Sequence, residues 1–274
     1  MRRRLREFFN DLKYQTIGLP RFKVRTGDCF VTSFPRSGNT WMRYMLFHAL
    51  YGDHQWDLTQ IERRMPIVDR PDIRRSIKAM GDQPFRLFKS HEPFRHYFLT
   101  GKTAYLVRDG RDALVSYYHY RLHMNQTRRT MSQWVRRSIR GRFRYGPWHD
   151  HVAGWLAHQE HPSVIVVRYE QMVDEPARQL KRVLDHFGLP VSDEQIERAA
   201  AEVTIDHVNR GFERWASDQA RQYNGGLGGG SGKGRDQLAA EDHVFFMRRA
   251  GEVMERLGYG GGRSDEGVAG SGRQ

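Results

Sequence analysis

Short runs of consecutive apolar residues alternate along the chain with longer segments whose apolar residues recur every three or four positions. The short runs are rich in β-branched residues, as in Ser163–Tyr169, and are typical of strands buried on both faces. The longer segments have the spacing of helices with one apolar face. The pattern predicts strands at Asp28–Phe34, Phe85–Lys89, Thr103–Arg108 and Ser163–Tyr169. It predicts helices at Asn39–Tyr51, Asp109–Arg121, Glu175–Phe187 and Leu238–Leu257.

Buried strands that alternate with helices predict a single α/β domain, in which helices flank a central parallel β-sheet. The 274 residues are enough for one large domain. We divide the chain into a basic N-terminal segment (1–26), this domain (27–257) and a Gly/Ser-rich tail (258–274) that we expect to be flexible.

Composition narrows the class of protein. Hydrophobic residues make up 38% of the chain, enough for a core, and the one cysteine, Cys29, excludes a disulfide framework. No apolar stretch approaches the roughly 20 residues needed to cross a bilayer, and the basic N-terminus lacks the apolar run of a secretory signal. These features predict a reducing, cytoplasmic location.

The net charge of +13 is concentrated in two segments. Residues 1–25 carry eight Arg/Lys and two acids, and residues 121–144 carry eight Arg and no acid, so the rest of the chain is close to neutral. A general nucleic-acid binder more often spreads basic charge over a docking face, and we therefore expect no nucleic-acid partner. The apolar residues of 121–144 have helical spacing, so a helix there would expose its arginines on the remaining surface.

The first candidate anion site joins the first strand to the first helix. Its sequence, Ser-Phe-Pro-Arg-Ser-Gly-Asn-Thr-Trp, spans residues 33–41. Backbone N–H groups in such a turn, together with a helix N-terminus, bind anions, and Gly38 lets the backbone approach the anion closely. The spacing is not that of a Walker A loop. The polar side chains around the glycine are Arg36, Ser37, Asn39 and Thr40.

Two further groups of polar residues follow buried strands. Arg108 ends one strand and can bind an oxyanion, and Ser116 lies two helical turns further on. Lys89 and His91 end another strand and are two residues apart, so both side chains project to the same side of an extended chain. A histidine beside a lysine is expected to stay neutral, as a general base must.

Ligands of open α/β sheets bind at the carboxyl ends of the strands. Two anion sites there suit a nucleotide with phosphates at both its 3′ and 5′ positions. We interpret Arg111 and Asp112 as surface charges at the start of a helix. The sequence contains no metal-ligand cluster, so we expect no metal.

These residues resemble the sulfotransferases of the cytosolic and bacterial type that depend on 3′-phosphoadenosine 5′-phosphosulfate (PAPS). The similarity covers roughly residues 27–257. It implies a fold like that of P-loop NTPases with a phosphosulfate-binding loop, with PAPS as cofactor and 3′-phosphoadenosine 5′-phosphate (PAP) as product. Four motifs in family order carry it: Pro35–Trp41, Lys89-Ser90-His91, Arg108 with Val115-Ser116-Tyr117-Tyr118, and Tyr169-Glu170 with Phe187-Gly188-Leu189-Pro190.

The resemblance implies a role for each matching residue. The residues expected to hold the 5′-phosphosulfate are Arg36, Ser37, Gly38, Asn39 and Thr40. Those expected near the adenine are Trp41, Tyr169, Thr204 and Ile205, and those at the 3′-phosphate are Arg108 and Ser116. His91 would take the acceptor proton, while Lys89 and Arg36 would offset negative charge on the bridging oxygen.

The chain departs from the family in its last cofactor loop. Gly229, Gly232 and Arg235 match the family's Arg-Lys-Gly-x-x-Gly-x-Trp-Lys, but the leading Arg-Lys pair and the Trp are missing. Arg221, Lys233 or Arg235 would then complete the 3′-phosphate site. The family's dimer motif is also absent, which leaves the oligomeric state open.

The sequence does not identify the acceptor. It is consistent with a hydroxyl or amine of a small molecule, a lipid or a glycan, and with an anionic acceptor or peripheral membrane contact if the basic segments are recognition surfaces. The alternative for 121–144 is a solvated helix face. Two other classes of function are a P-loop-like kinase, which would need a Walker Lys-Ser/Thr pair, and a non-catalytic nucleotide- or RNA-binding module, against which Lys89 and His91 argue.

Overall fold

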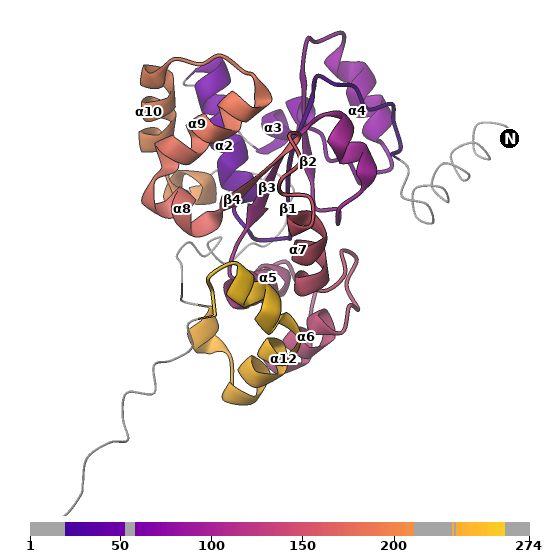
Figure 1. The fold of residues 1–274 in the computed structure, drawn as a ribbon, viewed down its shortest axis with the longest axis vertical. Coiled ribbons are helices and arrows are strands. Elements are labelled where there is room, and N and C mark those ends of the chain that lie inside the picture. Colours follow the sequence, from indigo (N-terminus) through magenta and orange to yellow (C-terminus); the bar gives the residue numbers. More distant parts are fainter. Residues whose placement is uncertain (1–19, 53–57, 211–231, 233, 261–274) are drawn as a thin grey trace, which may run out of the picture.

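A sheet of four parallel strands lies between two groups of helices (Figure 1). The computed structural model describes residues 20–52, 58–210, 232 and 234–260. The strands are β1 (Asp28–Ser33), β2 (Arg86–Ser90), β3 (Lys102–Val107) and β4 (Val164–Arg168), in the order β2-β1-β3-β4. The four strands expected from the sequence and the α/β fold class with a central parallel sheet are confirmed.

Helices connect the strands and cover both faces of the sheet. They are α2 (Asn39–Tyr51), α3 (Leu58–Arg64), α4 (Ile73–Met80), α5 (Gly110–His123), α6 (Met131–Ile139), α7 (Trp148–Leu156), α8 (Tyr169–Asp174), α9 (Pro176–Phe187), α10 (Asp193–Glu202) and α12 (Ala240–Arg256). The four expected helices are confirmed as α2, α5, α9 and α12, and the helix expected within 121–144 is α6. The apolar pattern misses α3, α4, α7, α8 and α10.

Each strand sends alternate side chains into two separate cores. In β1, Val31 packs into the core that α2, α9 and α10 cover, whereas Phe30 packs into the core formed with α5, α6, α7 and α12. The same alternation places Leu106 and Tyr105 of β3 on opposite faces. Burial on both faces explains why the strands are continuous apolar runs rather than alternating ones.

The division of the chain into 1–26, 27–257 and 258–274 stays a prediction, because residues 1–19 and 261–274 lie outside the described part. Within the described residues, no helix combines the length and the apolar character that a membrane span requires.

A buried ion pair joins the first residues of the two neighbouring strands β1 and β2. Asp28 and Arg86 are register partners, and both are almost fully buried. The guanidinium donates two hydrogen bonds of 2.7 Å to the two carboxylate oxygens. This bidentate geometry fixes the register at the amino ends of the strands, opposite the edge where polar residues gather.

We expect Asp28→Asn to lower the free energy of unfolding by about 3–5 kcal/mol, because the substitution leaves a buried guanidinium without its counter-charge. Urea denaturation measures the change. The matched control is Asp82→Asn, which removes a 3.6 Å pair with Arg25 whose carboxylate is almost fully exposed. This control substitution should lower the free energy of unfolding by less than about 1 kcal/mol. Equal losses in the two variants would contradict a special role for the buried pair.

Candidate active site

A cleft of about 780 Å³ opens at the carboxyl ends of β1, β2 and β3. Its walls bring together the three polar groups that the sequence singles out, which are up to about 70 residues apart in sequence. The predicted site residues that line it are Arg36, Gly38, Asn39, Thr40, Trp41, Lys89, His91, Arg108, Tyr169 and Ile205. The position agrees with the rule that ligands of parallel sheets bind at this edge.

The turn between β1 and α2 has the backbone of an anion cradle. Arg36 and Gly38 both have positive φ values, 71° and 90°, so the chain curls around its own N–H groups at the start of α2. A Cβ on Gly38 would lie 2.8 Å from the Tyr169 ring, so only glycine fits there. The hydroxyl of Ser37 is fully buried and has no hydrogen-bond partner in the described residues. An unpaired buried donor in such a turn fits a bound phosphate or sulfate oxygen.

Asn39 uses its side-chain amide inside the protein. Its Nδ2 lies 3.1 Å from the Val31 carbonyl, and 3.4 Å from both Ser33 Oγ and the Ser90 carbonyl. These contacts tie the ends of β1 and β2 to the first turn of α2. The prediction that Asn39 binds the cofactor must therefore rest on its backbone N–H group.

The geometry around His91 fixes its tautomer. The ring Nδ1 lies 2.9 Å from the Ser33 carbonyl, an atom that can only accept a hydrogen bond, so Nδ1 carries the proton and Nε2 is left with a free lone pair. Burial lowers the pKa of His91 well below its usual value, and the positive charge of Lys89 lowers it further. A neutral imidazole with an unprotonated Nε2 is suited to accept a proton.

A second histidine, which sequence reasoning missed, holds the backbone at His91. His151 of α7 lies 3.1 Å from the His91 carbonyl through Nε2 and 3.0 Å from the Tyr105 hydroxyl through Nδ1. Burial lowers the pKa of His151 to about 4, so it stays neutral. The two contacts are to residues 60 and 46 positions away, and no local sequence pattern indicates them.

Lys89 faces the cleft above a second buried cation that sequence reasoning also missed. Arg43, one turn after Asn39 on α2, is fully buried, and none of its three guanidinium nitrogens has a hydrogen-bond partner in the described residues. Burial, and then the positive charge of Arg43, lower the pKa of Lys89 to about 8. The site thus concentrates positive charge that few acidic groups offset.

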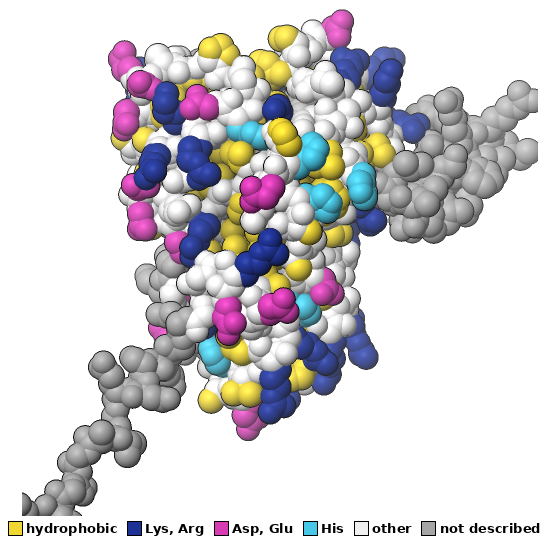
Figure 2. Space-filling view, viewed as in Figure 1, with side chains coloured by type: hydrophobic (Ala, Val, Ile, Leu, Met, Phe, Trp, Pro, Cys, Tyr) yellow, Lys and Arg dark blue, Asp and Glu magenta, His cyan; other side chains and the backbone are white. Residues whose placement is uncertain are grey.

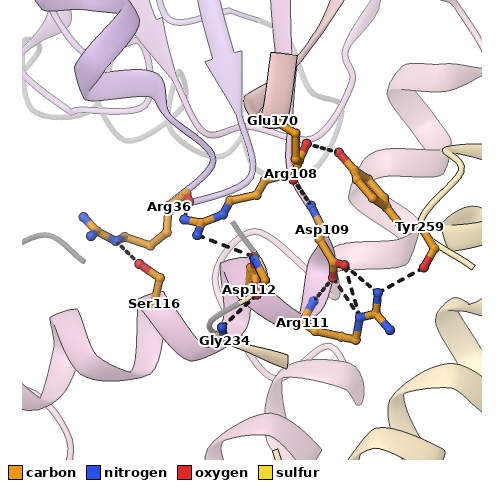
Figure 3. Close-up of polar contacts among 10 residues, drawn as sticks. Arg36, Arg108, Asp109, Arg111, Asp112, Ser116, Glu170, Gly234 and Tyr259 are labelled. Atoms are coloured by element: carbon orange, nitrogen blue, oxygen red, sulfur yellow. Dashed lines mark hydrogen bonds and ion pairs between the residues drawn. The ribbon is translucent and has the colours of Figure 1, made fainter. Parts of the chain in front are cut away.

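The acidic residue that organises the Arg108 side of the cleft is Asp112 (Figure 3). Its carboxylate accepts hydrogen bonds from the backbone N–H groups of Gly232 (2.6 Å) and Gly234 (2.9 Å). It also lies 3.7 Å from the Arg108 guanidinium. The expectation that Asp112 is a surface charge is wrong, because this carboxylate is almost fully buried and joins α5 to the glycine-rich segment.

Arg111 is not a surface charge either. Its guanidinium binds the Asp109 carboxylate, at 2.6 Å, and the Tyr259 carbonyl, at 3.0 Å (Figure 3). Asp109 in turn caps α5 and receives support from Glu170 at the start of α8. These buried contacts fix the N-terminus of α5, and with it Arg108, against segments that follow 60 to 150 residues later.

Arg36 and Arg108 lie on the same side of the cleft. Arg36 Nε donates to Ser116 Oγ at 3.1 Å, and its guanidinium lies 5.2 Å from the Tyr120 ring centre. Arg108 donates to the Arg36 carbonyl at 3.2 Å and stacks over Tyr169 at 4.3 Å. The structure therefore joins Arg36, Arg108 and Ser116 into one cationic group.

The residues expected near the adenine fall into two sets. Trp41 and Tyr169 meet edge to face, with ring centres 6.2 Å apart, and Trp41 Nε1 is held by the Val203 carbonyl at 2.6 Å. Ile205 lines the cleft. Thr204 instead accepts a hydrogen bond from the His207 N–H group, as the cap of a following turn. Of the last cofactor loop, Gly229, Lys233 and the side chain of Arg235 lie outside the described residues.

Two of the arginines in segment 121–144 form ion pairs with acidic residues elsewhere in the chain, which the segment's own sequence does not indicate. Arg136 pairs with Asp242 at 2.7 Å, which ties α6 to α12, and Arg144 pairs with Asp69 at 3.2 Å. The others that gather around one shallow hollow are Arg128, Arg129, Arg137, Arg140 and Arg142. Figure 2 shows Lys and Arg side chains in dark blue at the lower right of this face, in the region of α6.

In the described residues, no group of three or more His, Cys, Asp and Glu could hold a metal ion.

Comparisons with known proteins agree with this geometry. A family model described as "Sulfotransferase domain" matches residues 26–225. Human Sulfotransferase 2B1 is 30% identical over 194 residues, which are 66% of this chain and 52% of the relative. Cytosolic sulfotransferase 1 of Danio rerio is 26% identical over 205 residues, which are 69% of this chain and 68% of the relative. The chain thus matches between about half and about two thirds of the length of these curated relatives.

The fold also matches solved structures. The crystal structure of retinol dehydratase in complex with retinol and PAP aligns with a TM-score of 0.71 at 18% identity, covering 89% of this chain and 85% of that chain. At this identity, the likeness concerns the fold.

We expect Arg43→Met to raise the pKa of Lys89 above its value of about 8, because the substitution removes a neighbouring like charge. The apolar side chain has a similar length and should not lower stability, since a buried cation without partners is costly. NMR titration of labelled lysine side chains measures the pKa. The matched control is Arg198→Met on the exposed face of α10, which should leave it unchanged.

The same depressed pKa sets the sign of a stability change. Between pH 8 and the ordinary lysine value of 10.5, the unfolded chain binds the Lys89 proton and the folded chain does not. The contribution of Lys89 to the free energy of unfolding is therefore unfavourable below pH 8 and becomes less so up to 10.5. This pH dependence of the free energy of unfolding should be smaller in Arg43→Met. An unchanged pKa of Lys89 in that variant would contradict the electrostatic coupling between Arg43 and Lys89.

Proposed function

The chain belongs to the sulfotransferase family, and we propose that it transfers the sulfuryl group of PAPS to a hydroxyl or amine of an acceptor and releases PAP. The family resemblance inferred from the motifs is confirmed. One observation supports the reaction most directly: a neutral His91 with a free Nε2 stands beside Lys89 in a cleft whose turn is built for an anion.

His91 would act as the general base. Its Nε2 takes the proton of the acceptor group as the acceptor oxygen or nitrogen forms a bond to sulfur. The bond between sulfur and the bridging oxygen breaks, and its electron pair stays on the 5′-phosphate of PAP. Lys89 lies on the same side as His91 and offsets the charge that grows on the bridging oxygen. Arg36, which is held by Ser116, contributes from the other side of the loop.

The cofactor would lie across the carboxyl ends of β1 and β3. The turn at residues 35–40 would hold the 5′-phosphosulfate, with the unpaired Ser37 hydroxyl as one donor. Arg108 and Ser116 would hold the 3′-phosphate, and Trp41, Tyr169 and Ile205 would border the adenine. Asp112 would act through the glycine-rich segment, which its carboxylate holds against α5.

The acceptor would be a small molecule, a lipid or a glycan. The solved structure of similar fold is a complex of retinol dehydratase with retinol and PAP, which supports a small-molecule acceptor. We further propose a cytoplasmic location, which the name of the fish relative and the buried, unreactive Cys29 support; burial raises the pKa of that thiol to about 12.

We expect His91→Asn to reduce sulfuryl transfer roughly 100-fold or more, the usual contribution of a general base. PAP affinity, measured by calorimetry, should stay within a few-fold, because His91 faces the acceptor rather than the phosphates. His96→Asn, an exposed histidine of the 3₁₀ turn His96–Thr100, serves as the control. Turnover in His91→Asn above about a tenth of the parent would remove His91 from the base role.

Arg108→Ala should weaken PAP binding by roughly 10-fold or more, the size of one charge-assisted hydrogen bond. Affinity for adenosine 5′-phosphosulfate, which lacks the 3′-phosphate, should change little. Calorimetry with both nucleotides measures the two affinities, and Arg182→Ala on α9 controls for loss of a distant arginine. Equal losses for the two nucleotides would show that Arg108 supports the fold instead.

A further inference from the structure

Besides Arg36 and Arg108, four arginines from two stretches of the chain line the cleft that contains Lys89 and His91. Arg63 and Arg70 come from α3 and the segment after it, and Arg121 and Arg144 come from α5 and the segment before α7. If the nucleotide occupies the side of Arg108, this is where an acceptor must lie to reach His91.

The acids of this region are already paired. Glu62 lies 3.1 Å from Arg70. Asp69 lies 3.2 Å from Arg144 and also accepts a hydrogen bond of 2.8 Å from the Tyr145 hydroxyl. The two acids therefore neutralise Arg70 and Arg144 and leave the charges of the other two arginines unbalanced.

Arg63 and Arg121 have no acidic partner within 4.0 Å in the described part of the chain. Arg63 is exposed at the cleft. Arg121 is half-buried, and its Nε is buried without a hydrogen-bond partner. The buried Nε of Arg121 therefore lacks a hydrogen-bond acceptor, and an oxygen atom of a ligand can supply one.

Arg43 adds positive charge near Lys89 and His91. It is fully buried, its nitrogens have no hydrogen-bond partners in the described residues, and its charge acts on Lys89 and His91. A cleft with low-dielectric walls concentrates the field of such charges on its contents. This positive field would stabilise an anionic acceptor in the cleft, whereas it would add little to the binding of an uncharged one.

We propose that the acceptor carries an oxyanion, a carboxylate or a phosphate, beside the group that receives the sulfuryl, and that Arg63 and Arg121 bind it. The proposal rests on the proposed function of the cleft. Arg63, from α3, and Arg121, from α5, are then specificity-determining residues for the acceptor, which bind its anion while its hydroxyl faces His91.

The test compares two matched pairs of probes with the PAP-loaded protein. The first pair is a tetrasaccharide that contains glucuronic acid and the same tetrasaccharide with its carboxyls reduced. The second is glucose 6-phosphate and glucose. Ligand-observed NMR titrations measure the four affinities. The anionic member of at least one pair should bind about 10-fold more tightly than its partner, with a difference that shrinks as salt rises. The pair that responds distinguishes a carboxylate from a phosphate.

Variants locate the contact. Arg63→Gln and Arg121→Gln should each remove most of the preference for the anionic probe while PAP affinity stays unchanged. The matched control is Arg248→Gln, an exposed arginine of α12, which should keep the preference.

Two results would overturn the proposal. One is equal or weaker binding of both anionic probes than of their uncharged partners, which includes the absence of any binding. The other is a preference that survives in both cleft variants. Loss of PAP binding by the parent protein would instead count against the proposed function, so the two failures are distinguishable.

Discussion

Positive charge that is buried with few counter-charges is the constraint on which the site depends. Arg43 is enclosed without hydrogen-bond partners in the described residues, and Lys89 lies close enough to have its pKa lowered by it. Together they help to keep His91 neutral. Each of these cations is costly in the absence of an anion, and a bound anion relieves the cost of all of them together. We therefore expect a bound anion to raise the pKa of Lys89 and favour its charged form.

The fold tolerates this arrangement because the surrounding structure is held by ordinary, fully paired groups. The Asp28–Arg86 pair closes the amino ends of the strands. At the carboxyl ends, Asp109 with Arg111 fixes the start of α5, and Asp112 holds the glycine-rich segment. The unpaired hydroxyl of Ser37 lies in the turn that borders the cleft, where a ligand oxygen can satisfy it.

The two halves of the cleft have different chemical characters. The half proposed for the nucleotide combines a backbone cradle with aromatic rings, Trp41 and Tyr169, and its cations are tied to serine, carbonyl or carboxylate oxygens. The half proposed for the acceptor is bordered by arginines of which only some are paired. With this division, the residues that border the proposed acceptor can change without disturbing those that border the proposed nucleotide.

The sequence by itself determined the strands, the long helices and the polar turn between β1 and α2, because each is a local pattern: continuous apolar runs, helical spacing, and polar residues around Gly38. It also placed Lys89 and His91 on one side of a strand. The tertiary structure alone decided which charges are buried and what they contact. Asp112 meets glycines about 120 positions away, Arg136 meets Asp242, and His151 meets the His91 carbonyl. The sequence of α2 does not indicate that Arg43 is fully buried in the folded protein. Burial and pairing are properties of the packed chain, and they set the pKa values and the unpaired donors from which the chemistry follows.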